Sequence, residues 1–299
     1  WFRPSPQSAW IKLVNDARVS QLFVPYHPGS PRYLDVTFGF GDVPLGSLDC
    51  PGPTGTILGG DELCKQVRDR GLAWKHDFLV RRGEELVLWS VMAAANYNYI
   101  VEWTFRDDGI VIGRVGATGQ IGGPNAHMHG PIWRLDLDLN GACCDTVAKF
   151  THTESGPHAT DSMVDTRLES AFTWNPLSFT MLHIRDRSLK NSNNKASEWH
   201  LMPTRDGTPR HQEAFTKSAL WVSRYKWSEI AGNDLPTYIS PPEPVSNRDV
   251  VLWYYGGLHH LIRDEDTEMT HLMWTGFILK PMNVWPKTQL YPGFYALKR

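Results

Sequence analysis

Three histidines and the tyrosines upstream of them are the side chains in this sequence best suited to metal and redox chemistry. His127 and His129 are two residues apart, and His259-His260 forms a distant pair. In an extended strand, side chains at i and i+2 point to the same face, about 7 Å apart, a separation that one metal ion can bridge. A third imidazole would complete an all-histidine site. Imidazole ligands suit copper and zinc alike, so this spacing leaves the metal open.

Two further motifs flank the histidine pair, and their order identifies a family. Asn96-Tyr97-Asn98-Tyr99 comes before it, and Trp253-x-x-x-Gly-x-x-His follows it, ending at His260. This ordered set resembles the copper amine oxidases. In that family the tyrosine after the asparagine is converted, with copper and dioxygen, into the quinone cofactor topaquinone. The resemblance implies these roles: Tyr97 as cofactor precursor, Asn96 as the residue that orients the cofactor, and His127, His129 and His260 as copper ligands.

The segment before these motifs resembles two further family motifs. Leu22-Phe23-Val24-Pro25-Tyr26 is similar to a Val-Pro-Tyr motif whose tyrosine hydrogen-bonds the cofactor and helps gate it, which implies that role for Tyr26. Tyr33-Leu34-Asp35-Val36 is similar to the motif that contains the catalytic base, which implies Asp35. A base of this kind works best when burial raises its pKa toward neutrality. The alternative is that Asp35 is a turn or cap residue.

The resemblance also implies a second metal site and a disulfide. At the family's offsets from the copper ligands, the calcium-type site falls on Asp136, Asp138 and Asp249. Three converging carboxylates would repel one another unless a hard cation lay between them. Asp136 and Asp138 are alternatively the solvated face of an amphipathic strand. The family disulfide falls on Cys50 and Cys64.

The composition of the 299-residue chain limits its fold and its partners. Thirteen Trp, 25 Gly and 21 Pro favour strands and turns over helices. Together with the resemblance, this predicts an all-β fold, a large β-sandwich with few short helices, as one domain over 1–299 in which 1–15 are the remnant of a preceding segment. The net charge of −2 argues against nucleic acid as a partner. No apolar run approaches the roughly 20 residues of a membrane-spanning helix.

The element pattern is clear in some regions and weak in others. Residues 127–139 alternate between apolar and polar, and Asn140-Gly141 predicts a tight hairpin turn after them. Residues 152–215 are the least regular, and 249–255 is expected to be the last core strand. The remaining histidines, such as His152, His183, His200 and His271, are interpreted as structural.

Two functional hypotheses follow. The first is a copper- and topaquinone-dependent oxidase that turns a primary amine into an aldehyde, ammonia and hydrogen peroxide, with dioxygen as acceptor, in a homodimer as the family implies. The second is a copper-binding homologue without quinone chemistry, acting as a binding or structural component. Two departures from the family keep it open: the shortened surroundings of Asp35, and Asn98 where the family prefers an acidic residue. The one disulfide implied by the resemblance favours an extracellular or periplasmic compartment, because disulfides persist in oxidising surroundings. The sequence does not identify the compartment.

Overall fold

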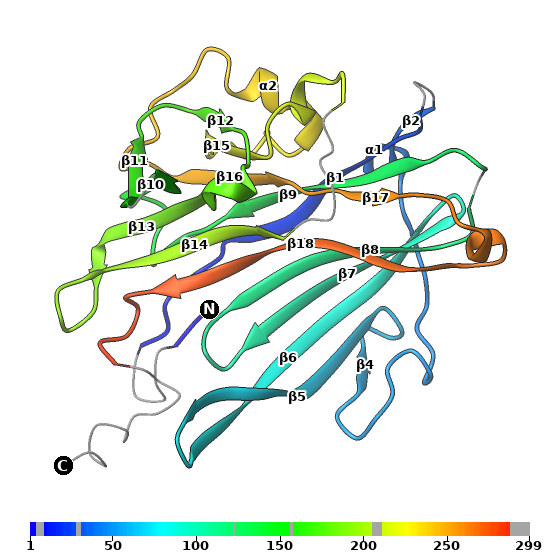
Figure 1. Cartoon of the computed structure of the whole chain (residues 1–299), viewed down its shortest axis with the longest axis horizontal. Helices are drawn as coiled ribbons and strands as arrows, with labels where there is room; N and C mark the ends of the chain where they lie inside the picture. The colour runs from blue at the N-terminus through cyan, green and yellow to red at the C-terminus, as the bar shows by residue number, and fades with distance from the viewer. Residues whose placement is uncertain (4–8, 28–30, 122, 156–157, 205–210, 288–299) are drawn as a thin grey trace.

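The computed structural model describes residues 1–3, 9–27, 31–121, 123–155, 158–204 and 211–287. Antiparallel strands make up most of this part of the chain, and its helices are single turns (Figure 1). This confirms the predicted all-β fold with few short helices. The helical turns are α1 (Asp35–Phe38), α2 (Leu235–Tyr238), η1 (Pro176–Ser178), η2 (Ala214–Thr216), η3 (Gly232–Asp234) and η4 (Asp264–Thr267).

The smaller sheet has seven strands among the described residues, in the order β12-β15-β16-β9-β1-β2, with β17 also paired to β9. Strand β9 is therefore its centre and contacts three neighbours. The strands are β1 (Asp16–Pro25), β2 (Arg32–Leu34), β9 (His127–Asp136), β12 (Ser170–Phe172), β15 (Leu220–Arg224), β16 (Val250–Tyr255) and β17 (Leu258–His260).

The larger sheet has eleven described strands, in the order β11-β10-β13-β14-β18-β8-β7-β6-β5-β4, with β3 paired to β6. They are β3 (Gly41–Asp42), β4 (Thr56–Leu58), β5 (Leu63–His76), β6 (Leu79–Ala94), β7 (Tyr97–Arg106), β8 (Val111–Gly119), β10 (Asp145–Ser155), β11 (His158–Thr166), β13 (Met181–Lys190), β14 (Ala196–Thr204) and β18 (Thr270–Met282).

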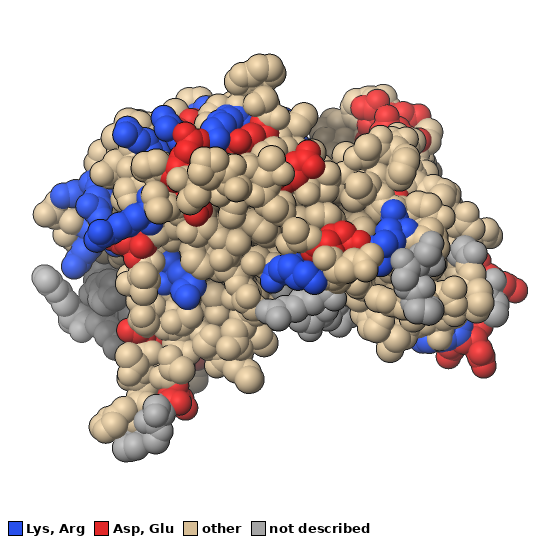
Figure 2. Space-filling model, turned by 90° about the horizontal axis from the view of Figure 1, so that it is seen from above, with Lys and Arg blue, Asp and Glu red and all other residues tan. Residues whose placement is uncertain are grey.

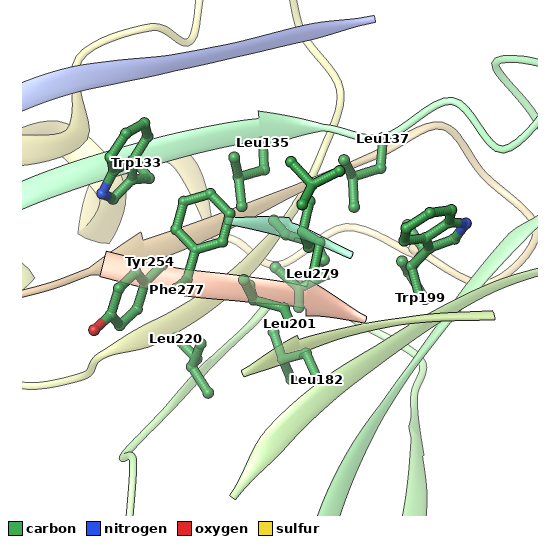
Figure 3. Close-up of a cluster of buried hydrophobic side chains, with 14 of the residues drawn as sticks. Trp133, Leu135, Leu137, Leu182, Trp199, Leu201, Leu220, Tyr254, Phe277 and Leu279 are labelled. Atoms are coloured by element: carbon green, nitrogen blue, oxygen red, sulfur yellow. The ribbon is translucent and has the colours of Figure 1, made fainter. Parts of the chain in front are cut away.

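Apolar side chains from both sheets form the main core between them (Figure 3). Trp133 of the smaller sheet packs edge-on against Phe277 of the larger one, with ring centroids 5.1 Å apart. Every residue of β9 is buried, because a second cluster that includes Trp253 and Leu235 covers the other face of this sheet. Side chains on both faces of β9 are thus removed from water, including those of its histidines.

Three predictions about individual elements were wrong. Asn140-Gly141 does not close a hairpin, because β9 lies in the smaller sheet and β10 in the larger one, so the chain crosses between layers there. The region 152–215 contains long paired strands, and β18 follows 249–255 as a central strand of the larger sheet. Here β10 pairs with β11 and β13 with β14, each the next strand along the chain, and β14 also pairs with the distant β18. The local sequence pattern of these strands is too weak to reveal them.

The remaining predictions on organisation concern the disulfide, the N-terminal segment and the surface. Cys50 and Cys64 form a disulfide, with Cα atoms 5.7 Å apart. In the described part of 1–15, Phe2 packs against Trp199 and Leu13 joins the core, and the division of the chain into domains stays a prediction.

Figure 2 shows acidic and basic side chains scattered around a wide uncharged area. Among the described residues no helix is long and apolar enough to span a membrane.

Candidate active site

Strands β9 and β17 bring the three predicted histidines together. His127 and His129 lie two residues apart on β9, and His260 of β17 pairs directly opposite His127. The three side chains are almost fully buried, and each offers a ligand atom within 4.8 Å of the other two. The arrangement is what the i, i+2 spacing predicted, with the third imidazole supplied by the neighbouring strand.

The Tyr97 hydroxyl lies among these imidazoles. Tyr97 is the first residue of β7 in the opposite sheet, and its oxygen is 3.0 Å from His127 Nε2 and 3.0 Å from His260 Nδ1. Burial raises the pKa of the Tyr97 hydroxyl well above its ordinary value. Without a cation beside it, this phenol therefore stays protonated at neutral pH.

Hydrogen bonds on the outer side of each ring determine which nitrogen faces inward. His127 Nδ1 contacts the Asn125 carbonyl oxygen at 3.0 Å, and His260 Nε2 contacts Asp266 Oδ2 at 3.3 Å. The acceptors hold these ring nitrogens as N–H donors, which leaves His127 Nε2 and His260 Nδ1 as the inward lone pairs. The two tautomers therefore suit metal ligation.

His129 is the ring that tests whether copper fits. Its Nδ1 is 2.9 Å from the Tyr99 hydroxyl, whereas its Nε2 is buried and has no hydrogen-bond partner among the described residues. A buried, unpartnered polar atom costs about 1–3 kcal/mol, so a ligand at this position would remove a real penalty. Three inward imidazole nitrogens and a phenolic oxygen form a donor set that suits a cupric ion.

The charge state of the rings agrees with this interpretation. Burial lowers the pKa of His127 to about 4, lowers the pKa of His129 well below its ordinary value, and lowers the pKa of His260. All three are thus neutral at pH 7, the form in which imidazole binds a metal.

Asp35 is joined to the histidine cluster through Tyr99. The Tyr99 hydroxyl donates to Asp35 Oδ2 at 3.3 Å, so it accepts a hydrogen bond from His129 Nδ1. Burial raises the pKa of Asp35 to about 6, and the Tyr99 hydrogen bond opposes that rise. Asp35 begins the single turn α1, and its carboxyl has the pKa of a proton acceptor at neutral pH rather than that of a solvated turn residue.

A cavity of about 640 Å³ gathers the predicted residues of the substrate side. Tyr26, Asp35, Asn96 and Tyr97 all line it. The Tyr26 ring stacks on His127 with centroids 4.2 Å apart, which places this tyrosine between the cavity and the imidazoles. Residues far apart in the sequence thus meet at one opening beside Tyr97.

The three predicted calcium ligands also converge. Asp136, Asp138 and Asp249 offer oxygens within 4.8 Å of one another, and Asp136 and Asp138 are buried, which excludes the solvated-face alternative. Burial and the neighbouring carboxylates raise the pKa of Asp249 to about 6, and Lys12 Nζ contacts Asp138 at 2.8 Å. Arg134, 3.8 Å from Asp136, and Lys12 supply two positive charges against three carboxylates, so a cation here remains a proposal.

Sequence reasoning missed two residues of the site. Asp266, which is buried beside His260 and ion-paired to Arg263 at 2.9 Å, lies in no motif that would have identified it. Tyr99 was part of a quoted motif but received no role. Its i, i+2 spacing from Tyr97 matches that of the histidine pair, and this match could have indicated that both tyrosines face both histidines.

Replacing Tyr99 by Phe should raise the pKa of Asp35 by about 0.5–1 unit, because the hydrogen bond to the carboxylate is lost. The measurement is a carboxyl ¹³C NMR titration, with the Asp35 signal assigned from an Asp35→Asn variant. Tyr33→Phe, in the same cavity, is the matched control and should leave the titration unchanged. An unchanged or lower Asp35 pKa in Tyr99→Phe would contradict the proposed hydrogen-bonded connection.

Comparisons with known proteins agree with this geometry. The family model described as "Copper amine oxidase, enzyme domain" matches residues 61–130 and 120–290. The chain is 25% identical to "Primary amine oxidase 2" of Arabidopsis thaliana (91% of this chain, 52% of the relative). It is 24% identical to "Primary amine oxidase" of Arthrobacter sp. (strain P1) (90% of this chain, 53% of the relative). It spans about half the length of these relatives.

Solved structures share the fold. The amine oxidase of Aspergillus nidulans superposes with a TM-score of 0.78 at 19% identity, over 93% of this chain and 48% of that one. The copper-containing benzylamine oxidase of Hansenula polymorpha gives a TM-score of 0.74 at 19% identity, over 93% of this chain and 56% of that one. With the family model matching most of its length, the chain belongs to the copper amine oxidase family.

Proposed function

We propose that the protein oxidises a primary amine to an aldehyde, consuming dioxygen and water and releasing ammonia and hydrogen peroxide. Copper would be held by His127, His129 and His260, and Tyr97 would be the precursor of topaquinone. The observation that carries the proposal is the position of the Tyr97 hydroxyl, 3.0 Å from the inward nitrogens of two buried imidazoles and at the wall of a cavity that contains Asp35.

When present, copper and the quinone formed from Tyr97 would supply a Lewis acid beside the phenolic oxygen and a two-electron acceptor for the amine. Asp35 would take the proton from the carbon next to the amine nitrogen, and its raised pKa suits that task. Tyr26 would hydrogen-bond the oxygen of the oxidised ring, and Asn96 would help hold its orientation. Tyr99 would hold the Asp35 carboxylate and the His129 ring in fixed positions, because its hydroxyl hydrogen-bonds both.

Two further features are part of the proposal. The Asp136, Asp138 and Asp249 oxygens would hold a calcium-type cation, because three neighbouring carboxylates offer the hard ligands that it prefers. The working form would be a homodimer, as in the family.

The apolar character of the cavity suggests the class of amine. Tyr26, Tyr33, Phe38 and Val24 line it, and Asp35 is its one carboxylate among the described lining residues. A diamine would place its second ammonium group against apolar walls, where an unpaired charge is costly. We therefore infer a monoamine with an aromatic or long alkyl group as substrate.

Conversion of Tyr97 is tested by exposing metal-free protein to cupric ion in air and measuring the mass of the peptide that contains Tyr97. The expected result is a gain of two oxygens and a loss of two hydrogens at Tyr97, with Tyr99 in the same peptide unchanged. Tyr97→Phe should show no such gain. An unmodified Tyr97 in protein that holds copper would reject the oxidase and favour the copper-binding homologue.

The role of Asp35 is tested by Asp35→Asn and by the pH dependence of the rate. Loss of the base should lower kcat by about 10²–10⁴-fold while copper content and the mass of the Tyr97 peptide stay unchanged. Because the deprotonated carboxylate is the active form, kcat/KM of the unaltered protein should rise with pH through about 6. Two results would contradict the assignment of Asp35 as the base: an Asp35→Asn variant that retains its kcat, or a kcat/KM that does not rise with pH through about 6.

The inferred substrate class is tested by peroxide release from a set of primary amines. Aromatic monoamines should give at least a tenfold higher kcat/KM than short diamines. The reason is that the described cavity lining has one carboxylate, Asp35, and so none to pair with a second ammonium group. A preference for diamines would contradict the inference about the cavity without affecting the proposed chemistry at Tyr97.

A further inference from the structure

A second group of buried imidazoles lies in the larger sheet, on strands β13 and β14. These strands are on the left in Figure 1, whereas β17 of the candidate copper site is on the right. His183 of β13 pairs directly opposite His200 of β14, and Glu198 lies two residues before His200. His183 and His200 are 5% and 8% exposed. Neither of the proposed activities uses these residues.

The three side chains converge on one point. Glu198 Oε2 is 3.5 Å from His183 Nδ1 and 3.5 Å from His200 Nε2, longer than an ordinary hydrogen bond. His183 Nδ1, His183 Nε2 and His200 Nε2 are buried without a hydrogen-bond partner in the described part of the chain. Unpartnered imidazole nitrogens around a single carboxylate oxygen are the polar atoms that a bound cation would satisfy.

The strand arrangement repeats that of the candidate copper site. There, one strand supplies His127 and His129 at i and i+2, and the paired strand supplies His260 opposite one of them. Here, β14 supplies Glu198 and His200 at i and i+2, and β13 supplies His183 opposite His200. The same backbone geometry thus presents three potential ligands at two separate places, with a carboxylate replacing one imidazole in the second.

The surroundings of the three groups suit ligation. Phe150 stacks on His183 with centroids 5.3 Å apart and covers the group on one side. A carboxylate and two imidazoles, shielded by an aromatic ring, are the features of a structural metal site.

We propose that His183, Glu198 and His200 bind one zinc-type divalent transition metal ion, which clips β13 to β14 independently of amine oxidation. Two ligand atoms at about 2.1 Å from a tetrahedral ion are about 3.4 Å apart, close to the two 3.5 Å separations. The His183 and His200 rings stack at 3.5 Å with their planes 12° apart, so binding requires one ring to rotate out of the stack. Two nitrogens and one carboxylate oxygen leave the fourth position to water.

The test measures zinc uptake with the free thiols replaced and the proposed copper and calcium sites filled. Cys143 and Cys144 are free thiols, so the background protein contains Cys143→Ser and Cys144→Ser. The background protein is first loaded with one equivalent of copper per chain and kept in excess calcium, so that the proposed copper and calcium sites are occupied. After equilibrium dialysis against zinc chloride, elemental analysis gives the zinc and copper per chain.

The background should bind one equivalent of zinc. Glu198→Gln, which preserves the side-chain shape, and His200→Gln should each weaken binding at least tenfold at unchanged copper content. His152→Gln is the matched control: His152 also contacts carboxylates, at 2.7 Å and 3.7 Å, but lies at the surface, and its loss should leave the zinc bound.

Zinc-edge X-ray absorption on the background protein tests the ligands without any substitution in the cluster. Two imidazoles and a carboxylate around zinc support the proposal. Absence of zinc in the background protein, coordination by oxygen ligands alone, or undiminished binding by Glu198→Gln would overturn it.

Discussion

The burial of three neutral imidazoles around one tyrosine hydroxyl is the constraint on which the rest of the site depends. It exists because β17 pairs with β9 in a register that sets His260 opposite His127, while β7 of the other sheet supplies Tyr97. A slip of one residue in this pairing would turn the histidines to the other face. In this register His129 Nε2 is buried without a hydrogen-bond partner among the described residues, which costs free energy. A ligand bound between the three imidazoles would remove that cost.

The outer hydrogen bonds connect this centre to the cavity. Asp266 and the Asn125 carbonyl fix the tautomers of two rings, and Tyr99 links the third ring to Asp35. The group proposed to move the substrate proton is thus joined by two hydrogen bonds to a proposed copper ligand. A ligand that withdraws electron density from His129 would make its Nδ1–H a stronger donor to Tyr99, and Tyr99 in turn a stronger donor to Asp35.

The sequence predicted the all-β fold and the convergence of Tyr26, Asp35, Tyr97 and the three histidines, because these residues lie in ordered motifs or at strand spacing. It did not predict the strands of 152–215, whose local sequence pattern is irregular even though β13 and β14 are consecutive strands that pair with each other. Asp266 carried no signal, since one aspartate in a polar turn resembles many others. His183 and His200 were interpreted as structural because their proximity results from pairing between β13 and β14, which neither strand reveals alone.

Electron paramagnetic resonance of the protein loaded with one equivalent of cupric ion tests the central claim most directly. The account predicts a single copper signal with hyperfine coupling to three imidazole nitrogens, reduced to two in a His129→Gln variant that remains folded. A copper signal without imidazole coupling, or one unchanged by that substitution, would contradict the claim that the buried histidine cluster is the copper site.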